Sequence, residues 1–380
     1  MSLKHRKTRK VHQPPVVSLA DQARKNGQRA GFDAGKEEGY LRGRANYIVN
    51  CAQEPLPFRQ LHVLYVSSGK GFPYSPLDEA IMSTLQGMVA QVTLSDPRQP
   101  VSQVALETRP DLVLVLDGMD IPIEHIDAIR QAGIQTAIWL TDDPYYTDMT
   151  LEIVKHYDHV FTLELNCIEL YRQHGCASVH YMPFAAFTNH YFPITTPSPL
   201  KREVSFIGSA YWNRVYFFNP IMPHLMSHNT VFNGIWWDRL PDYTAYGEKI
   251  ELGRWMSPQE TNDVYNGTKI VINLHRSHED DSVNNNQIKI PPASPNPRTF
   301  EIAASTTLQL TDARDDLARF YKPGVEIETY SSPQELIEKV DYYLTHEKER
   351  REIALRGLER TLKDHTYGRR INQLLSIVFP

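Results

Sequence analysis

The sequence has 380 residues, which is more than one hydrophobic core ordinarily organises, so two domains with additional segments are expected. Its composition, 41% hydrophobic and 22% charged, is that of a globular protein, and its net charge of -5 argues against a nucleic-acid binder. No stretch is apolar enough to span a membrane, and the charged N-terminus lacks the apolar core of a secretory signal.

The three cysteines, Cys51, Cys167 and Cys176, have no spacing that indicates a disulfide framework. They are expected to be free thiols in a reducing compartment, which predicts a cytoplasmic protein. No cysteine pair with histidines beside it indicates zinc, and no bound metal is predicted.

The N-terminal segment divides into two parts. Residues 1–18 are rich in Lys and Arg and are predicted to form a basic arm, either a solvated tail or a contact for an acidic surface. In residues 19–50 a glycine recurs every fourth residue, which would place the glycines on one stripe of a helix. The alternatives are a helix packed closely on its own chain or on a second copy, and a flexible glycine-rich segment. The glycines are Gly27, Gly31, Gly35, Gly39 and Gly43.

From residue 60 onward, short apolar strands alternate with helical segments, which is typical of a parallel α/β sheet. Helices are expected from near Pro76, near 122–132 and near 165–174. The predicted strands of this half are Leu61–Val66, Leu112–Leu116, Thr136–Leu140, Val160–Thr162 and Ser178–Tyr181.

A proline-rich segment, residues 183–200, is interpreted as a linker, after which the strand and helix pattern begins again. A long polar loop is expected at about 275–296, followed by a helix from about Arg298. The predicted strands of the second half are Val204–Gly208, Thr230–Gly234, Lys269–Leu274 and Leu308–Thr311. Two α/β halves of similar size are therefore the predicted architecture.

Open α/β sheets bind ligands at the carboxyl ends of their strands, and two such positions in the first half carry unusual polar residues. Ser68-Gly69-Lys70-Gly71 follows the first strand and is either an anion-binding loop or a simple strand-to-helix turn. Asp142 and Asp143 follow another strand, with Tyr145 close behind. Two adjacent carboxylates there suggest a general base with its positioning partner, a metal site, or a helix cap and turn.

Two positions in the second half point to phosphate recognition. Gly208-Ser209 ends a strand, and Arg214 follows in the first helical turns, where it is either a diphosphate ligand or a surface arginine. Arg298 lies at the start of a helix whose N-terminal N–H groups favour anions. Glu301, one turn further, is either an acceptor for a ribose diol or a partner of the helix dipole.

The second half resembles the donor-site signature of the spore-maturation CgeB-like glycosyltransferases. The resemblance extends over roughly residues 20–370, and its specific part is confined to the second half. The segments that carry it are Phe206-Ile207-Gly208-Ser209 with Asn213-Arg214, Ile272-Asn273-Leu274-His275-Arg276, and Arg298–Ala304 continuing to Leu310-Thr311-Asp312. The sequence departs from the family pattern at Ser305-Thr306-Thr307, where the family commonly has glycine.

The resemblance implies a GT-B fold, in which two Rossmann-like domains face a cleft, a UDP- or dTDP-sugar donor, and no essential metal. The implied domains are an N-terminal extension (1–55), an acceptor domain (56–195), a donor domain (196–365) and a terminal helix that packs back on the acceptor domain (366–380). By position, Glu301 matches the acid that holds the donor ribose, and Arg214 and Arg298 match diphosphate contacts. The implied donor-binding residues are Gly208, Ser209, Asn213, Arg214, Trp236, Asn273, His275, Arg298, Phe300 and Glu301.

The function expected from this resemblance is transfer of a sugar to a hydroxyl acceptor, on a polysaccharide or protein glycan of a spore or cell surface layer. Asp142 and Asp143 are the candidate catalytic residues, and the loop at 275–296 is expected to close over the donor. The remaining alternatives are a nucleotide-sugar-binding scaffold protein without catalysis and a sugar-nucleotide epimerase. The protein is expected to act in the mother-cell cytoplasm or at the spore surface, without nucleic acid, and the glycine stripe suggests a homodimer.

Overall fold

The computed structural model describes residues 18–52 and 55–380. The basic arm predicted for residues 1–18 therefore lies, except for Ser18, outside the described residues. The chain divides between Arg44 and Ala45, within the first helix, into an N-terminal unit and a larger unit that holds both sheets.

Helix α1, Leu19–Cys51, runs through all five glycines of the N-terminal stripe. Ser18 caps its start: the backbone N–H of Asp21 donates to Ser18 Oγ at 3.1 Å. The prediction of a helix, rather than a flexible glycine-rich segment, is confirmed. What the glycine stripe packs against, its own chain or a second copy, stays a prediction.

The first half forms a six-stranded, fully parallel sheet in the order β2-β1-β3-β4-β5-β6. The chain passes from β1 to β2 and then returns past β1 to β3, so the strand order reverses between β1 and β3. Ligands bind at such reversals in open α/β sheets. The strands are β1 (Arg59–Val66), β2 (Val89–Ser95), β3 (Leu112–Leu116), β4 (Gln135–Trp139), β5 (His159–Thr162) and β6 (Val179–Tyr181).

Both faces of this sheet are covered, because alternate residues of each strand point to opposite faces. Val63 and Tyr65 of β1 lie in one buried cluster with α2, whereas Leu64 and Val66 lie in another with α3 to α6. The helices of this half are α2 (Ser75–Gln86), α3 (Val101–Thr108), α4 (Ile123–Gln131), α5 (Thr147–Val154) and α6 (Cys167–Gln173).

The second half forms another six-stranded parallel sheet, in the order β12-β11-β10-β7-β8-β9. This is the Rossmann strand order, and its reversal lies between β7 and β10. The strands are β7 (Arg202–Ile207), β8 (Thr230–Gly234), β9 (Ile250–Leu252), β10 (Thr268–Asn273), β11 (Leu308–Asp312) and β12 (Glu328–Tyr330).

Helices cover both faces of the second sheet as well. Phe206, Phe232 and Ile272 lie in one buried cluster with α7, α8 and α12, and Val271 lies in another with α10 and α11. The helices of this half are α7 (Trp212–Phe218), α8 (Met222–Ser227), α9 (Tyr243–Tyr246), α10 (Pro258–Gly267), α11 (Pro297–Ala304), α12 (Pro333–Thr345) and α13 (Glu347–Asp364).

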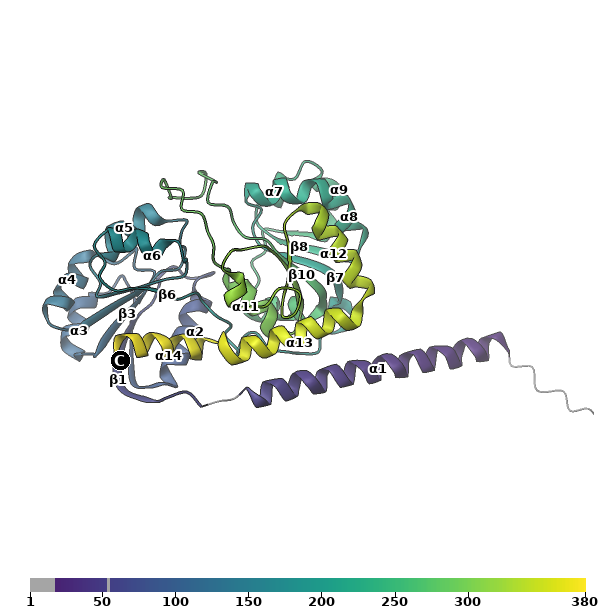
Figure 1. The fold of residues 1–380 in the computed structure, drawn as a ribbon, viewed down its shortest axis with the longest axis horizontal. Coiled ribbons are helices and arrows are strands. Elements are labelled where there is room, and N and C mark those ends of the chain that lie inside the picture. The colour runs from purple at the N-terminus through teal and green to yellow at the C-terminus, as the bar shows by residue number, and fades with distance from the viewer. Residues whose placement is uncertain (1–17, 53–54) are drawn as a thin grey trace, which may run out of the picture. The chain divides into compact units, whose positions relative to one another are not determined.

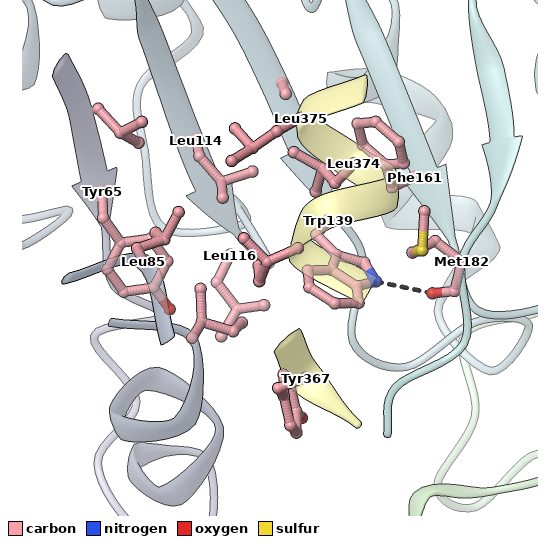
Figure 2. Close-up of a cluster of buried hydrophobic side chains, with 14 of the residues drawn as sticks. Tyr65, Leu85, Leu114, Leu116, Trp139, Phe161, Met182, Tyr367, Leu374 and Leu375 are labelled. Carbon is pink, nitrogen blue, oxygen red and sulfur yellow. Dashed lines mark hydrogen bonds between the residues drawn. The ribbon is translucent and has the colours of Figure 1, made fainter. Parts of the chain in front are cut away.

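The last helix, α14 (Tyr367–Val378), returns from the second half to the first (Figure 1). Its apolar face shares a buried cluster with Trp139 and Leu114, and Figure 2 shows Tyr367, Leu374 and Leu375 among these side chains. The indole of Trp139 donates to the carbonyl of Met182 at 2.8 Å. Burial of an apolar helix face in the other half's core fixes the two sheets to each other.

All nine strands predicted from the sequence are present, each with bounds within two residues of those predicted. Three strands were missed: β2, β9 and β12. The three cysteines are free thiols. Among residues 18–52 and 55–380, no helix combines the length and apolarity that crossing a bilayer requires.

Candidate functional site

Two adjoining cavities lie where the carboxyl ends of the two sheets meet. The larger, here called the central cavity, has a volume of about 340 Å³ and is lined from both halves. The smaller, here called the side cavity, has a volume of about 160 Å³ and lies mainly against the second half. Ser209, Trp255, Arg298 and Glu301 line both cavities. Several of the strand ends singled out in the sequence therefore lie at these cavities.

Glycines allow β7 and β8 to end in direct backbone contact beside the side cavity. A Cβ atom on Gly234 would lie 2.2 Å from the carbonyl oxygen of Gly208, and one on Gly208 would lie 2.9 Å from Arg214 Nη1. Both residues line the side cavity. Any side chain at Gly234 would push the two strand ends apart, so this part of the site requires glycine.

Arg214 is a buried cation at the strand reversal of the second sheet. Its guanidinium donates from Nε and Nη2 to the carbonyl of Leu274, at 3.0 and 2.7 Å, and from Nη1 to the carbonyl of Ser209, at 2.8 Å. Burial, assisted by the charge of Arg298, lowers the pKa of Arg214 to about 10, so the group stays protonated at neutral pH. The guanidinium therefore both ties β7 to β10 and places a positive charge at the central cavity.

A polar network fixes the N-terminus of α11 at the central cavity. Asn296 caps the helix, since its side chain accepts the N–H of Thr299 at 3.1 Å, and Asn273 bonds the side chain of Asn296. The backbone N–H of Asn296 also donates to His275 Nε2 at 2.9 Å. The other ring nitrogen of His275, Nδ1, lies 2.5 Å from Asp312 Oδ1, so the ring is the Nδ1–H tautomer. Burial lowers the pKa of His275.

Arg298 and Glu301 lie one turn apart on α11 and line both cavities. Within the described residues, neither Arg214 nor Arg298 forms an ion pair with a carboxylate, and the carboxylate of Glu301 accepts no hydrogen bond. Burial raises the pKa of Glu301 to about 7, against the opposing charge of Arg298. Two cations without anionic partners and one carboxylate without donors are the groups that a polar, anionic ligand would satisfy.

Asp142 and Asp143 both line the central cavity from the first half but differ in their surroundings. Asp143 is fully buried and accepts hydrogen bonds from Thr162 at 2.5 Å and Tyr171 at 2.7 Å. Burial raises its pKa to about 7. Asp142 is half-buried and accepts from the hydroxyl of Tyr74 at 2.7 Å through Oδ2. Its Oδ1 receives no hydrogen bond from the described residues, so Asp142 is the carboxylate available to a ligand.

The turn after β1 is held by hydrogen bonds within the first half. The N–H and hydroxyl of Ser68 donate to Asp78, at 2.9 and 2.7 Å, and Lys70 pairs with the buried Asp117 at 2.7 Å. The left-handed backbone of Gly69 packs against Pro97, where a Cβ would approach to 2.4 Å. The lysine charge is thus neutralised, and the turn positions the following residues Phe72 to Tyr74 at the cavities.

The long loop between β10 and α11 crosses to the first half. Asn285 exchanges backbone hydrogen bonds with Tyr145 and Asp148, and Thr147 donates to the side chain of Asn286 at 2.9 Å. Near the start of the loop, the guanidinium of Arg276 stacks over the ring of Tyr145 at 4.4 Å. The loop thus joins the halves beside the central cavity, and its closure over a donor stays a prediction.

Nine of the residues predicted from the sequence line these cavities and eight do not. The residues that line them are Asp142, Asp143, Tyr145, Gly208, Ser209, Arg214, His275, Arg298 and Glu301. The residues outside the linings are Ser68, Gly69, Lys70, Gly71, Asn213, Trp236, Asn273 and Phe300. Phe300 is a core residue, in ring contact with Tyr321 and His365, and Trp236 packs against Tyr211 and Arg239.

Several lining residues were not predicted from the sequence. Trp255 precedes α10, whose start carries a capping box between Ser257 and Glu260, so the strand-to-helix junction there could have been recognised. Tyr74 and Glu164 have no such local signal. Glu164 is buried and accepts backbone N–H groups of Asn166, Ala293 and Ser294, so it fixes the end of the crossing loop rather than facing a ligand.

The comparisons with known proteins agree with this geometry. Residues 214–376 match a family model described as "Glycosyl transferase-like". The chain is 29% identical over 309 residues to the spore protein CgeB of Bacillus subtilis (strain 168), a match that covers 81% of this chain and 95% of that protein. The span of the family model includes Arg214, Arg298 and Glu301.

Two solved structures have the same fold at low sequence identity. Anabaena HepE, solved in complex with UDP-glucose, has a TM-score of 0.57 at 11% identity and covers 83% of this chain and 98% of its own. Sucrose-phosphate synthase from Thermosynechococcus elongatus has a TM-score of 0.57 at 10% identity and covers 84% and 99%. The predicted GT-B fold is confirmed.

Proposed function

We propose that this chain, which has a GT-B fold and is similar to the spore protein CgeB and to a glycosyl transferase-like family model, transfers a sugar from a UDP- or dTDP-sugar donor to a hydroxyl acceptor without a metal. The observation that carries this proposal is the group of charges at the cavities. Arg214, Arg298 and Glu301 all line the central cavity. Among the described residues, Arg214 and Arg298 form no ion pair with a carboxylate, and the carboxylate of Glu301 accepts no hydrogen bond.

The two arginines are suited to a diphosphate. Arg298 adds its charge to the N-terminus of α11, where backbone N–H groups and the helix dipole favour an anion. Arg214 supplies a second fixed positive charge from beneath the central cavity. When the bond from the sugar C1 to the diphosphate oxygen breaks, that oxygen takes the electron pair, and these cations stabilise the developing charge. This is the role that a metal ion serves in other transferases.

Glu301 is suited to the ribose of the nucleotide. Its carboxylate has open acceptor sites and lies between the side cavity and the central cavity. A ribose diol offers two hydroxyl donors to such a group. The nucleobase would then occupy the side cavity beside Ile235 and Met256, and the sugar the central cavity. The structure of HepE with UDP and glucose supports a uridine nucleotide at a site of this fold.

Asp142 is the residue that we assign as general base. It lines the central cavity opposite the donor residues, and the hydroxyl of Tyr74 fixes its orientation. In the step, the acceptor oxygen bonds to the sugar C1, the diphosphate leaves, and the acceptor proton moves to Asp142 Oδ1. Asp143 has both oxygens engaged by Thr162 and Tyr171, so it supports the turn rather than taking the proton.

The acceptor class rests on the match to a spore protein. Similarity to CgeB over nearly the whole of that protein supports a polysaccharide or protein glycan of the spore surface as acceptor. Trp255, which lines both cavities, is half exposed and meets the ring of Phe72 edge to face at 5.9 Å, so it offers apolar surface to a sugar face.

A donor-hydrolysis and transfer assay tests the proposal. The full chain is incubated with UDP-glucose, UDP-galactose, UDP-N-acetylglucosamine or dTDP-glucose, with chelator or Mg²⁺, and the released nucleoside diphosphate is measured. We expect nucleoside diphosphate to be released either from the UDP-sugars or from the dTDP-sugar, and chelator should not affect this release. With an acceptor glycan present, the release should be lost in Asp142→Asn. An epimerised sugar nucleotide as the sole product, or release only with Mg²⁺, would contradict the proposal.

A further inference from the structure

A group of metal-ligating side chains lies on the second half, away from the two cavities. His224 and His228 are four residues apart at the end of α8, and Asp341 lies on α12. Their ligand atoms all lie within 4.8 Å of one another. Among residues 18–52 and 55–380 this is the one group of three His, Cys, Asp or Glu side chains with that property.

The geometry of the group points to one centre. Nε2 of His224 lies 2.9 Å from Asp341 Oδ1, and Nε2 of His228 lies 3.3 Å from the same oxygen. In a tetrahedral zinc site the metal–ligand bonds are about 2.0–2.1 Å, which separates adjacent ligand atoms by about 3.3 Å. The two distances to Asp341 are thus close to the spacing that a shared zinc ion imposes, and the two histidine ligand atoms lie within 4.8 Å of each other.

The state of His228 gives a second, independent observation. Its Nε2 atom is buried and has no hydrogen bond of acceptable geometry with the described residues. A buried polar nitrogen without a partner is costly, and a bound ion would satisfy it. On the other side of the ring, Glu203 Oε2 lies 4.0 Å from Nδ1. A carboxylate at that nitrogen is the outer partner that metal-bound histidines commonly have.

The group is separate from the donor site. His228 precedes β8 at its amino end, whereas Gly234, at the carboxyl end of β8, lines the side cavity. Sites for ligands in these sheets lie at the carboxyl ends, so an ion near His228 would take no part in transfer. It would instead link the turn after α8 to α12, two elements that pack on the same face of the second sheet.

We propose that His224, His228 and Asp341 bind one Zn²⁺ ion, or a similar borderline transition-metal ion, with water in the fourth position. Two imidazoles and one carboxylate form a ligand set that zinc accepts and that magnesium, which prefers oxygen ligands, does not. The ion replaces the proton on each Nε2 and holds α8 to α12.

The test uses the untagged full chain after treatment with chelator and dialysis. Zn²⁺, Co²⁺ and Mg²⁺ are titrated by calorimetry, and visible absorption is recorded for the Co²⁺ sample. We expect one tight Zn²⁺ ion per chain, the intense visible bands of tetrahedral cobalt, a rise in Tm with Zn²⁺, and no response to Mg²⁺ at the same concentration.

Two variants decide the assignment. His228→Asn and Asp341→Asn should each weaken Zn²⁺ binding by more than about tenfold and remove the cobalt bands. His156→Asn is the matched control, because His156 pairs with a single carboxylate, Asp127, at 2.8 Å. The metal-free Tm and the Tm shift with UDP should stay unchanged in all three. Zinc binding of equal strength in the wild type and both site variants, or no stoichiometric binding to the wild type, would overturn the proposal.

Discussion

Arg214 donates two hydrogen bonds to the carbonyl oxygen of Leu274, from Nε at 3.0 Å and from Nη2 at 2.7 Å. This pair of bonds joins the start of α7, the helix that follows β7, to the end of β10. β7 and β10 are the neighbouring strands between which the strand order of the second sheet reverses. The buried guanidinium therefore fixes the geometry of the cavity wall, and in the proposed function it also faces the donor. Arg298 faces the same cavity, and among the described residues it donates no comparable pair of hydrogen bonds to the end of a strand.

The two arginines should consequently respond differently to substitution. Arg214→Lys removes the fork that bonds Leu274 and Ser209, and we expect it to lower the free energy of unfolding by about 2–3 kcal/mol. Arg298→Ala should leave the Tm nearly unchanged but weaken UDP binding by about 10- to 100-fold, the equivalent of about 1.5–3 kcal/mol for a charge-assisted contact. Thermal unfolding and calorimetric titration with UDP measure the two effects.

Arg356→Ala, on the exposed side of α13, is the control for a general loss of positive charge. The account of the two roles is wrong if Arg298→Ala loses as much stability as Arg214→Lys while binding UDP normally.

Glu301 gives a prediction for pH dependence. Burial raises its pKa from 4.5 to about 7, so the folded protein retains a proton that the unfolded chain releases between these values. The contribution of Glu301 to stability therefore falls as pH rises from about 4.5 to about 7. Glu301→Gln should raise the free energy of unfolding above pH 7 by on the order of 1–3 kcal/mol and change little below pH 4.5.

The same substitution should weaken UDP binding, because the amide presents one oxygen acceptor where the carboxylate presents two. Wild-type UDP binding should strengthen as pH rises through 7, with release of a proton, and this dependence should be smaller in Glu301→Gln. Glu152→Gln, exposed on α5, is the matched control. A pH-independent UDP affinity in the wild type would disprove the assignment of Glu301 to the ribose.

Asp142 and Asp143 can be separated by their surroundings. Asp142→Asn should lower the rate of transfer by at least about 100-fold, because a general base contributes about 10²–10⁴-fold, and should leave UDP affinity unchanged. Asp143→Asn removes an acceptor for two buried hydroxyls, from Thr162 and Tyr171, and should chiefly lower the Tm. Steady-state transfer rates and thermal unfolding distinguish them, and full activity of Asp142→Asn would place the base elsewhere.

Thr306 takes the backbone conformation of a glycine at the position where the sequence departs from the family pattern. Its φ is +59°, the left-handed conformation that glycine adopts without strain, and its hydroxyl is buried without a partner. The turn after α11 is therefore formed despite the missing glycine, at a cost of about 1–2 kcal/mol. Thr306→Gly should recover about 1 kcal/mol of stability in chemical denaturation.

Thr307→Gly provides the contrast, because the Thr307 hydroxyl donates to the carbonyl of Tyr265 at 2.7 Å and its loss should destabilise the fold. If Thr306→Gly also destabilises the protein, the side chain makes a compensating contact and the strain argument fails.

The sequence alone was sufficient to predict the positions of the strands that are long and apolar. Leu112–Leu116, whose residues are all buried, was predicted with its exact bounds because a continuous apolar run between turns leaves little choice. β9 and β12 have three residues each, and β2 is half exposed, so their apolar signal is weak. Their place in the sheets is set by pairing with neighbouring strands, which one local segment does not encode.

The candidate site was predictable where a strand ends in glycine, as at Gly208, or where the start of a helix carries charge, as at Arg298 and Glu301. It was not predictable where a residue acts through distant partners. Phe300 was itself predicted as a donor-binding residue, but the helical turn directs its side chain into the core. Tyr74 reaches Asp142 from a turn 68 positions earlier, and only the assembled sheet brings them together.

The central claim is that the cavities bind a uridine or thymidine diphosphate through Arg298 and Glu301. The most direct test is the Tm of the wild type, Arg298→Ala and Glu301→Gln with UDP, dTDP, GDP and ADP, in the presence of chelator. The account predicts a Tm rise with UDP or dTDP alone in the wild type, much reduced in both variants. No nucleotide-dependent rise in the wild type, or the same rise in all three proteins, would contradict it.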